Sequence, residues 1–231
     1  MRKSRHGGAS DVPKGYDPSK YDRPSVTVDI ILFTVHDGWL EVLLIKRKHK
    51  PCAGMWAFPG GFVDMYEGLE DAALRELKEE TDLDKVYIEQ LGAYGDPGRD
   101  PRTRVITVAF IALAPADKLT PRAGDDAAEA VWHPAHNPPK LAFDHKWILA
   151  DAIERLQKRI WEAPVAFKML PDCFTMTELE QVYSAVAQKK INRGTITKNI
   201  KHIGDFILDE KKKRAAPDKR KRVYYRFKPA K

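Results

Sequence analysis

The pattern of apolar and polar positions predicts that the first part of the chain mixes strands with helices. Residues 25–34 are rich in β-branched side chains, and Asp37-Gly38 separates them from an apolar run over 40–45. This combination is typical of a β-hairpin. Further strands are expected over 86–91, 104–113 and 128–132, and helices over 69–80 and 145–161. Because strands and helices do not alternate strictly, the pattern favours an α+β sandwich.

A second, smaller unit is expected after Pro164, where proline and small residues interrupt the helical pattern. Thr175 or Thr177 can cap a helix, with Glu178 or Glu180 three residues later as the capping-box partner. Apolar residues then recur at helical spacing at Leu179, Val182, Tyr183 and Val186, and again at Ile196, Ile200 and Ile203, with Gly204 where a C-terminal cap would fall.

Two strands are expected after these helices, over 207–208 and 223–227, around a basic turn. Two helices followed by a hairpin predict a winged helix. We therefore expect a flexible N-terminal segment over 1–24, a large domain over 25–164 and a winged-helix domain over 165–231.

The net charge of +7 is distributed unevenly along the chain. Residues 168–231 contain 17 Lys or Arg and 7 Asp or Glu, which leaves residues 1–167 with 23 and 26. The excess positive charge therefore lies in the C-terminal unit. Such a segment is either a solvated tail or a surface for a polyanion, and charge alone does not decide between the two.

Cysteine spacing and the lack of long apolar runs bear on the compartment. Cys52 and Cys173 lie far apart, without the spacing of a disulfide framework or a thiolate zinc site. The basic residues 1–6 are followed by Gly, Asp and Pro instead of the apolar core of a signal peptide. No apolar run approaches the roughly 20 residues needed to cross a bilayer. We expect a cytoplasmic protein that does not bind membranes.

The helix expected over 69–80 carries the most informative residues. At about 100° per residue, Glu76, Glu79 and Glu80 all border its apolar face. Carboxylates in that position are costly unless they are paired or coordinated, and this spacing directs them toward one point. A hard cation with oxygen ligands, Mg²⁺ or Mn²⁺, fits best. The alternative is a charged solvent face, but other charged residues already occupy the opposite side of the helix.

This segment resembles the Nudix box, whose general form is Gly, five residues, Glu, seven residues, Arg-Glu, an aliphatic residue, any residue, Glu-Glu, any residue, Gly and an aliphatic residue. The matching residues are Gly61, Glu67, Arg75, Glu76, Leu77, Glu79, Glu80 and Leu83. Asp82 replaces the last glycine, and aspartate tolerates the left-handed backbone that a turn requires there. The resemblance implies a Nudix α/β/α sandwich with its metal ligands intact.

The resemblance also implies roles for individual residues. The implied metal ligands are Gly60, through its carbonyl, and Glu76, Glu79 and Glu80. Glu67 and Arg75 would orient these acids. In this family a metal-activated water attacks a diphosphate, and a loop carboxylate often serves as the base. Asp126, or its neighbour Asp125, is the candidate base here, although such loop aspartates are more often merely solvated.

Three arginines, Arg99, Arg102 and Arg104, precede or begin the strand expected over 104–113. Guanidinium groups bind phosphate oxygens bidentately, but a plain loop with surface arginines is the better interpretation of these residues by themselves. The segment nevertheless resembles one that is common among ADP-ribose-handling Nudix proteins, and Arg47 would complete a clamp for a diphosphate. Residues 142–145 resemble the same branch.

The two units together resemble the Nudix-related transcriptional regulators, which join an ADP-ribose-binding domain to a winged helix. The resemblance extends from Tyr21 over nearly the whole chain. It implies double-stranded DNA as a partner and a homodimer that binds a palindromic site. The implied DNA-contacting residues are Arg193, Thr195, Thr197, Lys198 and Lys201 in the recognition helix, and Lys219, Arg220, Lys221 and Arg222 in the wing.

Two functions remain open on this basis. The first is an ADP-ribose-responsive transcriptional regulator whose Nudix domain retains Mg²⁺-dependent ADP-ribose pyrophosphatase activity. The second is a dedicated pyrophosphatase for ADP-ribose or another nucleoside diphosphate sugar, in which the C-terminal unit serves dimerisation or other contacts. Many regulators of this kind have degraded metal motifs, whereas this chain keeps every acid, so hydrolysis belongs to both hypotheses.

Overall fold

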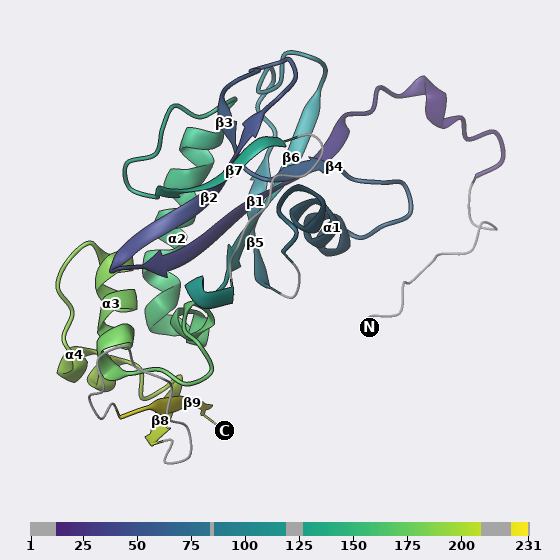
Figure 1. Cartoon of the computed structure of the whole chain (residues 1–231). Coiled ribbons are helices and arrows are strands. Elements are labelled where there is room, and N and C mark those ends of the chain that lie inside the picture. Colours follow the sequence, from purple (N-terminus) through teal and green to yellow (C-terminus); the bar gives the residue numbers. More distant parts are fainter. Residues whose placement is uncertain (1–12, 84–85, 119–126, 209–222, 231) are drawn as a thin grey trace.

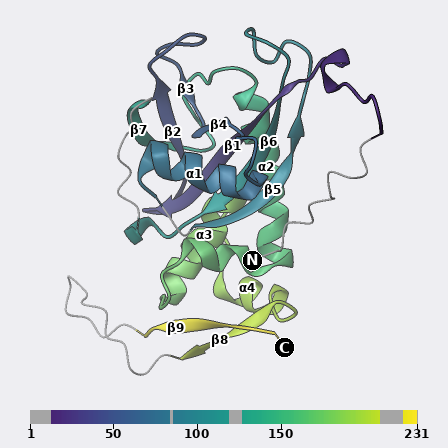
Figure 2. The same cartoon turned by 90° about the vertical axis from the view of Figure 1, so that its right-hand side faces the viewer.

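A computed structural model describes residues 13–83, 86–118, 127–208 and 223–230. A mixed sheet forms the larger unit, and a smaller unit of two helices and two strands lies at one end of it (Figure 1). The second view shows β8 and β9 at the far side of this smaller unit from the sheet (Figure 2). Within the described ranges, no helix has the length and apolar character needed to cross a membrane. The predicted α+β class is confirmed.

The larger sheet is organised around its longest strand, β1 (Ser25–His36). β1 pairs antiparallel with β2 through the Asp37-Gly38 turn, as the hairpin signal predicts, and parallel with β6. The short strand β4 also pairs with β1, while β3 and β7 pair with β2 and β5 pairs with β6. The bounds are β2 Trp39–Arg47, β3 Trp56–Ala57, β4 Gly60–Phe62, β5 Tyr87–Tyr94, β6 Val105–Leu113 and β7 Ala127–Pro134.

Alternate residues of β1 face two different helices, because successive side chains of a strand point to opposite faces. Val28, Ile30 and Leu32 share a buried cluster with Ala72, Ala73 and Leu77 of α1 (Leu69–Thr81). Ile31 and Phe33 belong to a second cluster with α2 (His145–Glu162). The sheet therefore lies between α1 and α2, which is the predicted α/β/α sandwich.

The smaller unit begins with a well-formed helix cap. Thr175 is the N-cap of α3 (Met176–Ala187): its hydroxyl accepts the Glu178 amide at 3.2 Å, and the Glu178 carboxylate accepts the Thr175 amide at 2.7 Å. This reciprocal pair selects Thr175 and Glu178 from the alternatives that the sequence leaves open.

The remaining bounds are η2 Pro18–Lys20, η3 Ala116–Lys118, η4 Pro164–Met169, α4 Arg193–Asn199, β8 Gly204–Leu208 and β9 Tyr225–Pro229.

The second helix of this unit, α4, is shorter than its apolar spacing predicts. It ends at Asn199, and the amides of Ile203 and Gly204 bond back to the Ile200 carbonyl in a turn. Gly204 starts β8 opposite Pro229, where an added Cβ would lie 2.4 Å from the Lys228 carbonyl oxygen. The prediction of a helix cap at Gly204 is wrong, because this glycine permits the close approach of two strands.

The two units share one hydrophobic core. Leu179, Val182 and Val186 of α3 belong to the same buried cluster as Phe33 and Val42 of the larger sheet. The Tyr183 hydroxyl donates to the Ile160 carbonyl at 3.0 Å, and that carbonyl lies in the last turn of α2, where helical partners run out. The smaller unit is therefore packed against the sandwich and hydrogen-bonded to the end of α2.

Replacing Tyr183 with Phe should lower the free energy of unfolding by about 1–2 kcal/mol, because the Ile160 carbonyl loses its donor in a buried environment. Denaturant titration of the full chain measures this change. Tyr66→Phe is the matched control, since Tyr66 is fully exposed, and it should change stability by less than about 0.5 kcal/mol. Equal stability of the two variants would mean that this bond contributes nothing to the junction.

Candidate functional site

Arg75 is the centre of a cluster of acids on α1. Its guanidinium donates to both oxygens of Glu67 at 2.6 and 3.0 Å, to Glu76 at 2.8 Å and to Glu79 at 3.2 Å. The hydrogen bonds from Arg75 to Glu67 are the main reason that the pKa of Glu67 is lowered to about 2. Burial raises the pKa of Glu76, and the Arg75 guanidinium opposes that shift. One cation thus keeps several neighbouring carboxylates close together.

The Gly60-Gly61 pair at the start of β4 brings the backbone of this strand against the same acids. The Gly60 amide donates to Glu80 at 2.8 Å, and a Cβ at Gly61 would lie 2.3 Å from a Glu76 oxygen. Gly60 has φ +154°, and a Cβ there would lie 2.1 Å from the Val28 carbonyl oxygen. At Gly60 a side chain would push β4 away from the backbone of β1, and at Gly61 it would displace the Glu76 carboxylate.

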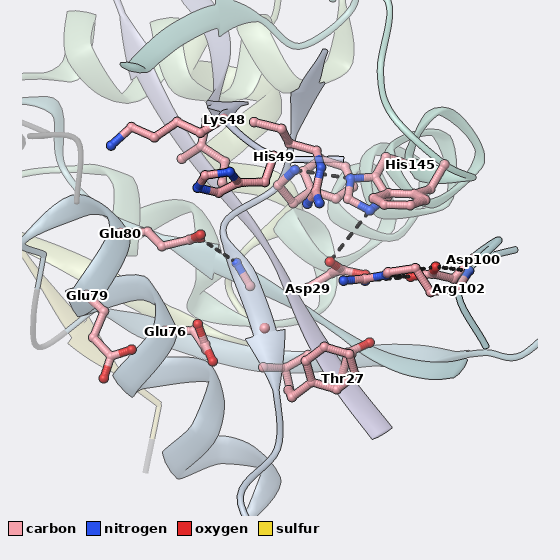
Figure 3. A pocket seen from close by; sticks show the side chains of 18 of the residues that line it. Thr27, Asp29, Lys48, His49, Glu76, Glu79, Glu80, Asp100, Arg102 and His145 are labelled. Carbon is pink, nitrogen blue, oxygen red and sulfur yellow. Dashed lines mark hydrogen bonds and ion pairs between the residues drawn. The ribbon is translucent and has the colours of Figure 1, made fainter. Parts of the chain in front are cut away.

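The donor set fits a hard divalent cation. Glu76, Glu79 and Glu80 line one side of a cavity of about 480 Å³ that Gly60 also borders (Figure 3). Among the residues that the structure describes, no group of His, Cys, Asp or Glu is already gathered tightly enough to enclose an ion. Carboxylates repel one another when no cation lies between them. Here Arg75 is the partner of Glu76 and Glu79, and the Gly60 amide is a partner of Glu80.

A cationic edge, formed by Arg47, Lys48 and Lys50, also lines the cavity from the end of β2 onward, with His49 among these residues. Arg47 donates through Nε to the Pro51 carbonyl at 3.0 Å, and its guanidinium lies 5.0 Å from the centre of the Phe143 ring. This position is compatible with the predicted phosphate contact of Arg47. The cavity therefore has both a cationic and a carboxylate-rich part.

The three predicted arginines after β5 have different environments. Arg99 has only 5% of its side chain exposed and forms a bidentate pair with Asp144 at 2.7 and 2.8 Å. Arg102 pairs with Asp100 at 2.7 Å and lies over the Phe62 ring, and both Arg99 and Arg102 line the cavity. Arg104 is exposed, bonds to the Val105 carbonyl at 3.3 Å and is absent from the described lining of the cavity.

The floor of the cavity is formed by buried groups that residue spacing did not identify. The His145 ring stacks on Phe58 at 4.6 Å, and its Nδ1 accepts the Phe58 amide at 3.1 Å. Burial lowers the pKa of His145, so the ring is neutral and carries its proton on Nε2. That atom lies 3.6 Å from the Asp29 carboxylate. A lone acid within the apolar β1 run was the signal available in the sequence.

Of the other predicted residues in this region, the structure describes Asp82 but not Asp126. Asp82 ends α1 with φ 60° and ψ 19°, the left-handed conformation expected where the Nudix box has glycine, and its amide donates to the Lys78 carbonyl at 2.8 Å. The proposed base Asp126 and its neighbour Asp125 lie outside the described residues.

The exposed face of α4 carries the residues expected to contact DNA. Arg193, Thr195 and Lys198 are exposed, as is Lys201 just after the helix, while Thr197 is half-buried. The Thr195 amide and hydroxyl both donate to the N-cap Asn192, and the Thr197 hydroxyl donates to the Arg193 carbonyl at 2.9 Å. Both threonines are therefore occupied in the helix itself. The four predicted wing residues, 219–222, lie outside the described part of the chain.

Comparison with family models covers both units. Residues 23–156 match the model described as the NUDIX domain, which is more than half of the chain. The chain belongs to the NUDIX family. Residues 166–227 match a second model, the NrtR DNA-binding winged helix domain. The Nudix domain therefore corresponds to the sandwich with its acid cluster, and the winged-helix domain to the unit that contains α3 and α4.

Relatives with known names resemble either the whole chain or the Nudix domain. The "ADPR responsive transcriptional repressor NtrR" of Acinetobacter baylyi is 32% identical over 92% of this chain and 85% of its own length. The "ADP-ribose pyrophosphatase" of Methanocaldococcus jannaschii is 46% identical over 57% of this chain and 74% of its own length.

Solved structures of Shewanella oneidensis NrtR give the same division. The protein complexed with a 27mer DNA matches with a TM-score of 0.73 and 32% identity, over 88% of this chain and 94% of that one. Its NUDIX domain complexed with ADP ribose matches with a TM-score of 0.55 and 38% identity, over 62% of this chain and 94% of that one.

Replacing Arg75 with Gln should destabilise the Nudix domain more in EDTA than in Mg²⁺. Without the guanidinium, Glu67, Glu76 and Glu79 repel one another, and a divalent cation relieves part of that repulsion. We expect a fall in melting temperature of roughly 4–8 °C in EDTA. Arg155→Gln, on the exposed face of α2, is the control. An equal fall in both buffers would show that Arg75 acts independently of a cation site.

Proposed function

We propose that this chain is an ADP-ribose-responsive transcriptional regulator, with a Nudix domain that binds the nucleotide and a winged helix that binds double-stranded DNA. The observation that carries the proposal is the presence, in one continuous chain, of the charged cavity and the exposed basic helix α4. The Acinetobacter relative, which matches 92% of this chain, is named for its response to ADPR and for transcriptional repression.

ADP-ribose, or a related nucleoside diphosphate, suits the chemistry of the cavity. A diphosphate needs positive charge, which Arg47, Lys48 and Lys50 supply on one side. A divalent cation at Glu76, Glu79 and Glu80 would supply it on the other, and Mg²⁺ or Mn²⁺ is the proposed ion. The volume of about 480 Å³ is within the range of small-molecule sites.

DNA is proposed to lie along the exposed face of α4. Lys198 and Lys201 extend the positive charge beyond the N-terminal Arg193, whose guanidinium lies 5.8 Å from the Tyr225 ring of β9. Because Thr195 and Thr197 use their hydroxyls within α4, the basic side chains are the better candidates for contacts with bases and phosphates. The wing residues 219–222 are proposed to contact phosphates.

Helix α2 provides a physical connection between the two sites. It begins at the cavity with His145, and its last turns contact α3 through Gln157, which donates to the Val186 carbonyl at 3.0 Å. A rigid-body shift of α2 on nucleotide binding would therefore move the winged helix. We propose that two copies pair and that such a shift changes the spacing of their α4 helices on a palindromic operator in the cytoplasm.

ADP-ribose pyrophosphatase activity is the second candidate function, and the complete acid set favours it. A bound Mg²⁺ or Mn²⁺ would activate the attacking water and neutralise charge on the diphosphate. Arg75 and Glu67 keep the acids in position, and Arg47 and Lys50 would orient the substrate. Asp126 remains the proposed base. In the alternative of a dedicated hydrolase, the C-terminal domain serves dimerisation or other contacts.

One purified sample of the full chain tests both functions. ADP-ribose should change its affinity for the promoter beside its own gene, and Mg²⁺ should support release of AMP from ADP-ribose. The double variant Glu79→Gln, Glu80→Gln should lose AMP release while it retains its fold, because two ligand charges are gone. If the chain binds no duplex at low salt, the regulator hypothesis is wrong. If the double variant still releases AMP, the catalytic metal does not bind at Glu79 and Glu80.

Neutralising Lys219, Arg220, Lys221 and Arg222 to Ala should weaken binding to all duplexes similarly, because phosphate contacts carry no sequence information. Each lost contact should reduce the slope of log affinity against log salt by about 0.9. Lys198→Ala should instead weaken the cognate site selectively, by roughly 1–3 kcal/mol if it reads a base. Fluorescence anisotropy over a salt series measures both effects. An unchanged slope for the four-residue variant would mean that these side chains do not contact DNA phosphates.

A further inference from the structure

Asp29 is a buried acid in the lining of the cavity, on a mostly apolar strand. It lies in β1 between the buried residues Val28 and Ile30, and only 12% of its side chain is exposed. Its backbone is opposite Gly60 of β4, and both residues line the cavity. Figure 3 shows it between the acids of α1 and the His145 ring. An ionised carboxylate in such a place needs close donors.

The protein donors around Asp29 are distant. Arg99 Nη2 is 3.5 Å from one carboxylate oxygen, and His145 Nε2 is 3.6 Å from the other. Charge-assisted hydrogen bonds are about 2.7–2.9 Å long. Arg99 meets that distance with Asp144 instead, at 2.7 and 2.8 Å. Asp29 therefore keeps capacity to accept hydrogen bonds on the side of the cavity.

The local charge determines which donors can approach. Asp29 and Asp144 carry two negative charges, and Arg99 supplies one positive charge between them. His145 adds none, because its Nδ1 accepts the Phe58 amide and burial disfavours a second proton. The Asp29 carboxylate itself repels a phosphate group placed directly against it. It favours a neutral ligand group with O–H donors, and sugar hydroxyls are such a group.

We propose that Asp29 is a specificity-determining residue that accepts a hydrogen bond from a sugar hydroxyl of the nucleoside diphosphate ligand. This inference rests on the proposed function and deepens it. The diphosphate lies between the cationic edge and the acids of α1, and the attached sugar lies over the Asp29, Arg99 and His145 floor. Arg99 thus serves as the buried partner of Asp144 that fixes this floor, and the phosphate contacts fall to Arg47 and its neighbours.

The test is calorimetric binding to the full chain with Ca²⁺ in place of Mg²⁺, since Ca²⁺ also prefers oxygen ligands. Three probes are compared: ADP-ribose, 2′,3′-dideoxy-ADP-ribose, which lacks both adenosine hydroxyls, and ADP, which lacks the terminal ribosyl group. Asp29→Asn should weaken ADP-ribose binding by about 10- to 100-fold, the effect of a hydrogen bond to a charged group. For at least one truncated probe, the loss should disappear, because the hydroxyl that Asp29 would accept is missing.

Asp151→Asn is the matched control, because Asp151 lies on the exposed face of α2 and accepts the Tyr94 hydroxyl outside the cavity. It should bind all three probes like the parent. Undiminished ADP-ribose binding by Asp29→Asn would overturn the inference. The same loss of affinity for every probe would also overturn it, because such a loss indicates damage to the fold or the cation site. If the parent chain itself does not bind ADP-ribose, the proposed function fails, and this outcome is distinct from the other two.

Discussion

The antiparallel pairing of β1 with β4 is the constraint on which the rest of the cavity depends. It joins Asp29 to Gly60, and each residue belongs to a different half of the site. Gly60 bonds to Glu80 of α1, whereas Asp29 faces His145 at the start of α2. Since β1 is also buried between both helices, a shift of this strand would move both walls of the cavity together.

Charge balance around the cavity explains why its acids are tolerated. Arg75 offsets part of the negative charge on the side that faces α1, and Arg99 offsets part of it on the side that faces α2. Each guanidinium is engaged by at least two carboxylates, so neither is a simple positive patch on the surface. Arg47, Lys48 and Lys50 differ in that they form a separate positive edge of the cavity. The cavity is therefore polar throughout but has regions of opposite sign.

The parts of this structure that the sequence predicts are those encoded over short distances. The β1–β2 hairpin, the acid spacing on α1 and the Thr175 capping box all depend on residues within a few positions of each other. The floor of the cavity depends on β1, the loop after β5 and the start of α2. Single-sequence patterns do not report which distant segments meet, so the predicted role of Arg99 lacked its partner Asp144.

Local patterns also fail where backbone approach determines the residue. Gly204 follows an apolar helical pattern and resembles a cap, yet its neighbour in space is β9. The strands β3 and β4 are too short to show a period, although β4 supplies the glycine backbone that contacts the acids of α1. In both cases the deciding contact is made by a backbone atom of another segment, and side-chain periodicity carries no record of it.

The shared core between sandwich and winged helix has a consequence for how operators are arranged. Because α3 is packed into the sheet and is not carried on a free tether, the distance between two α4 helices in the proposed dimer is a property of the folded protein. Half-sites would have to match that distance along the DNA helix. Insertion of a few base pairs between them would rotate one half-site to another side of the duplex and would prevent simultaneous binding by both copies.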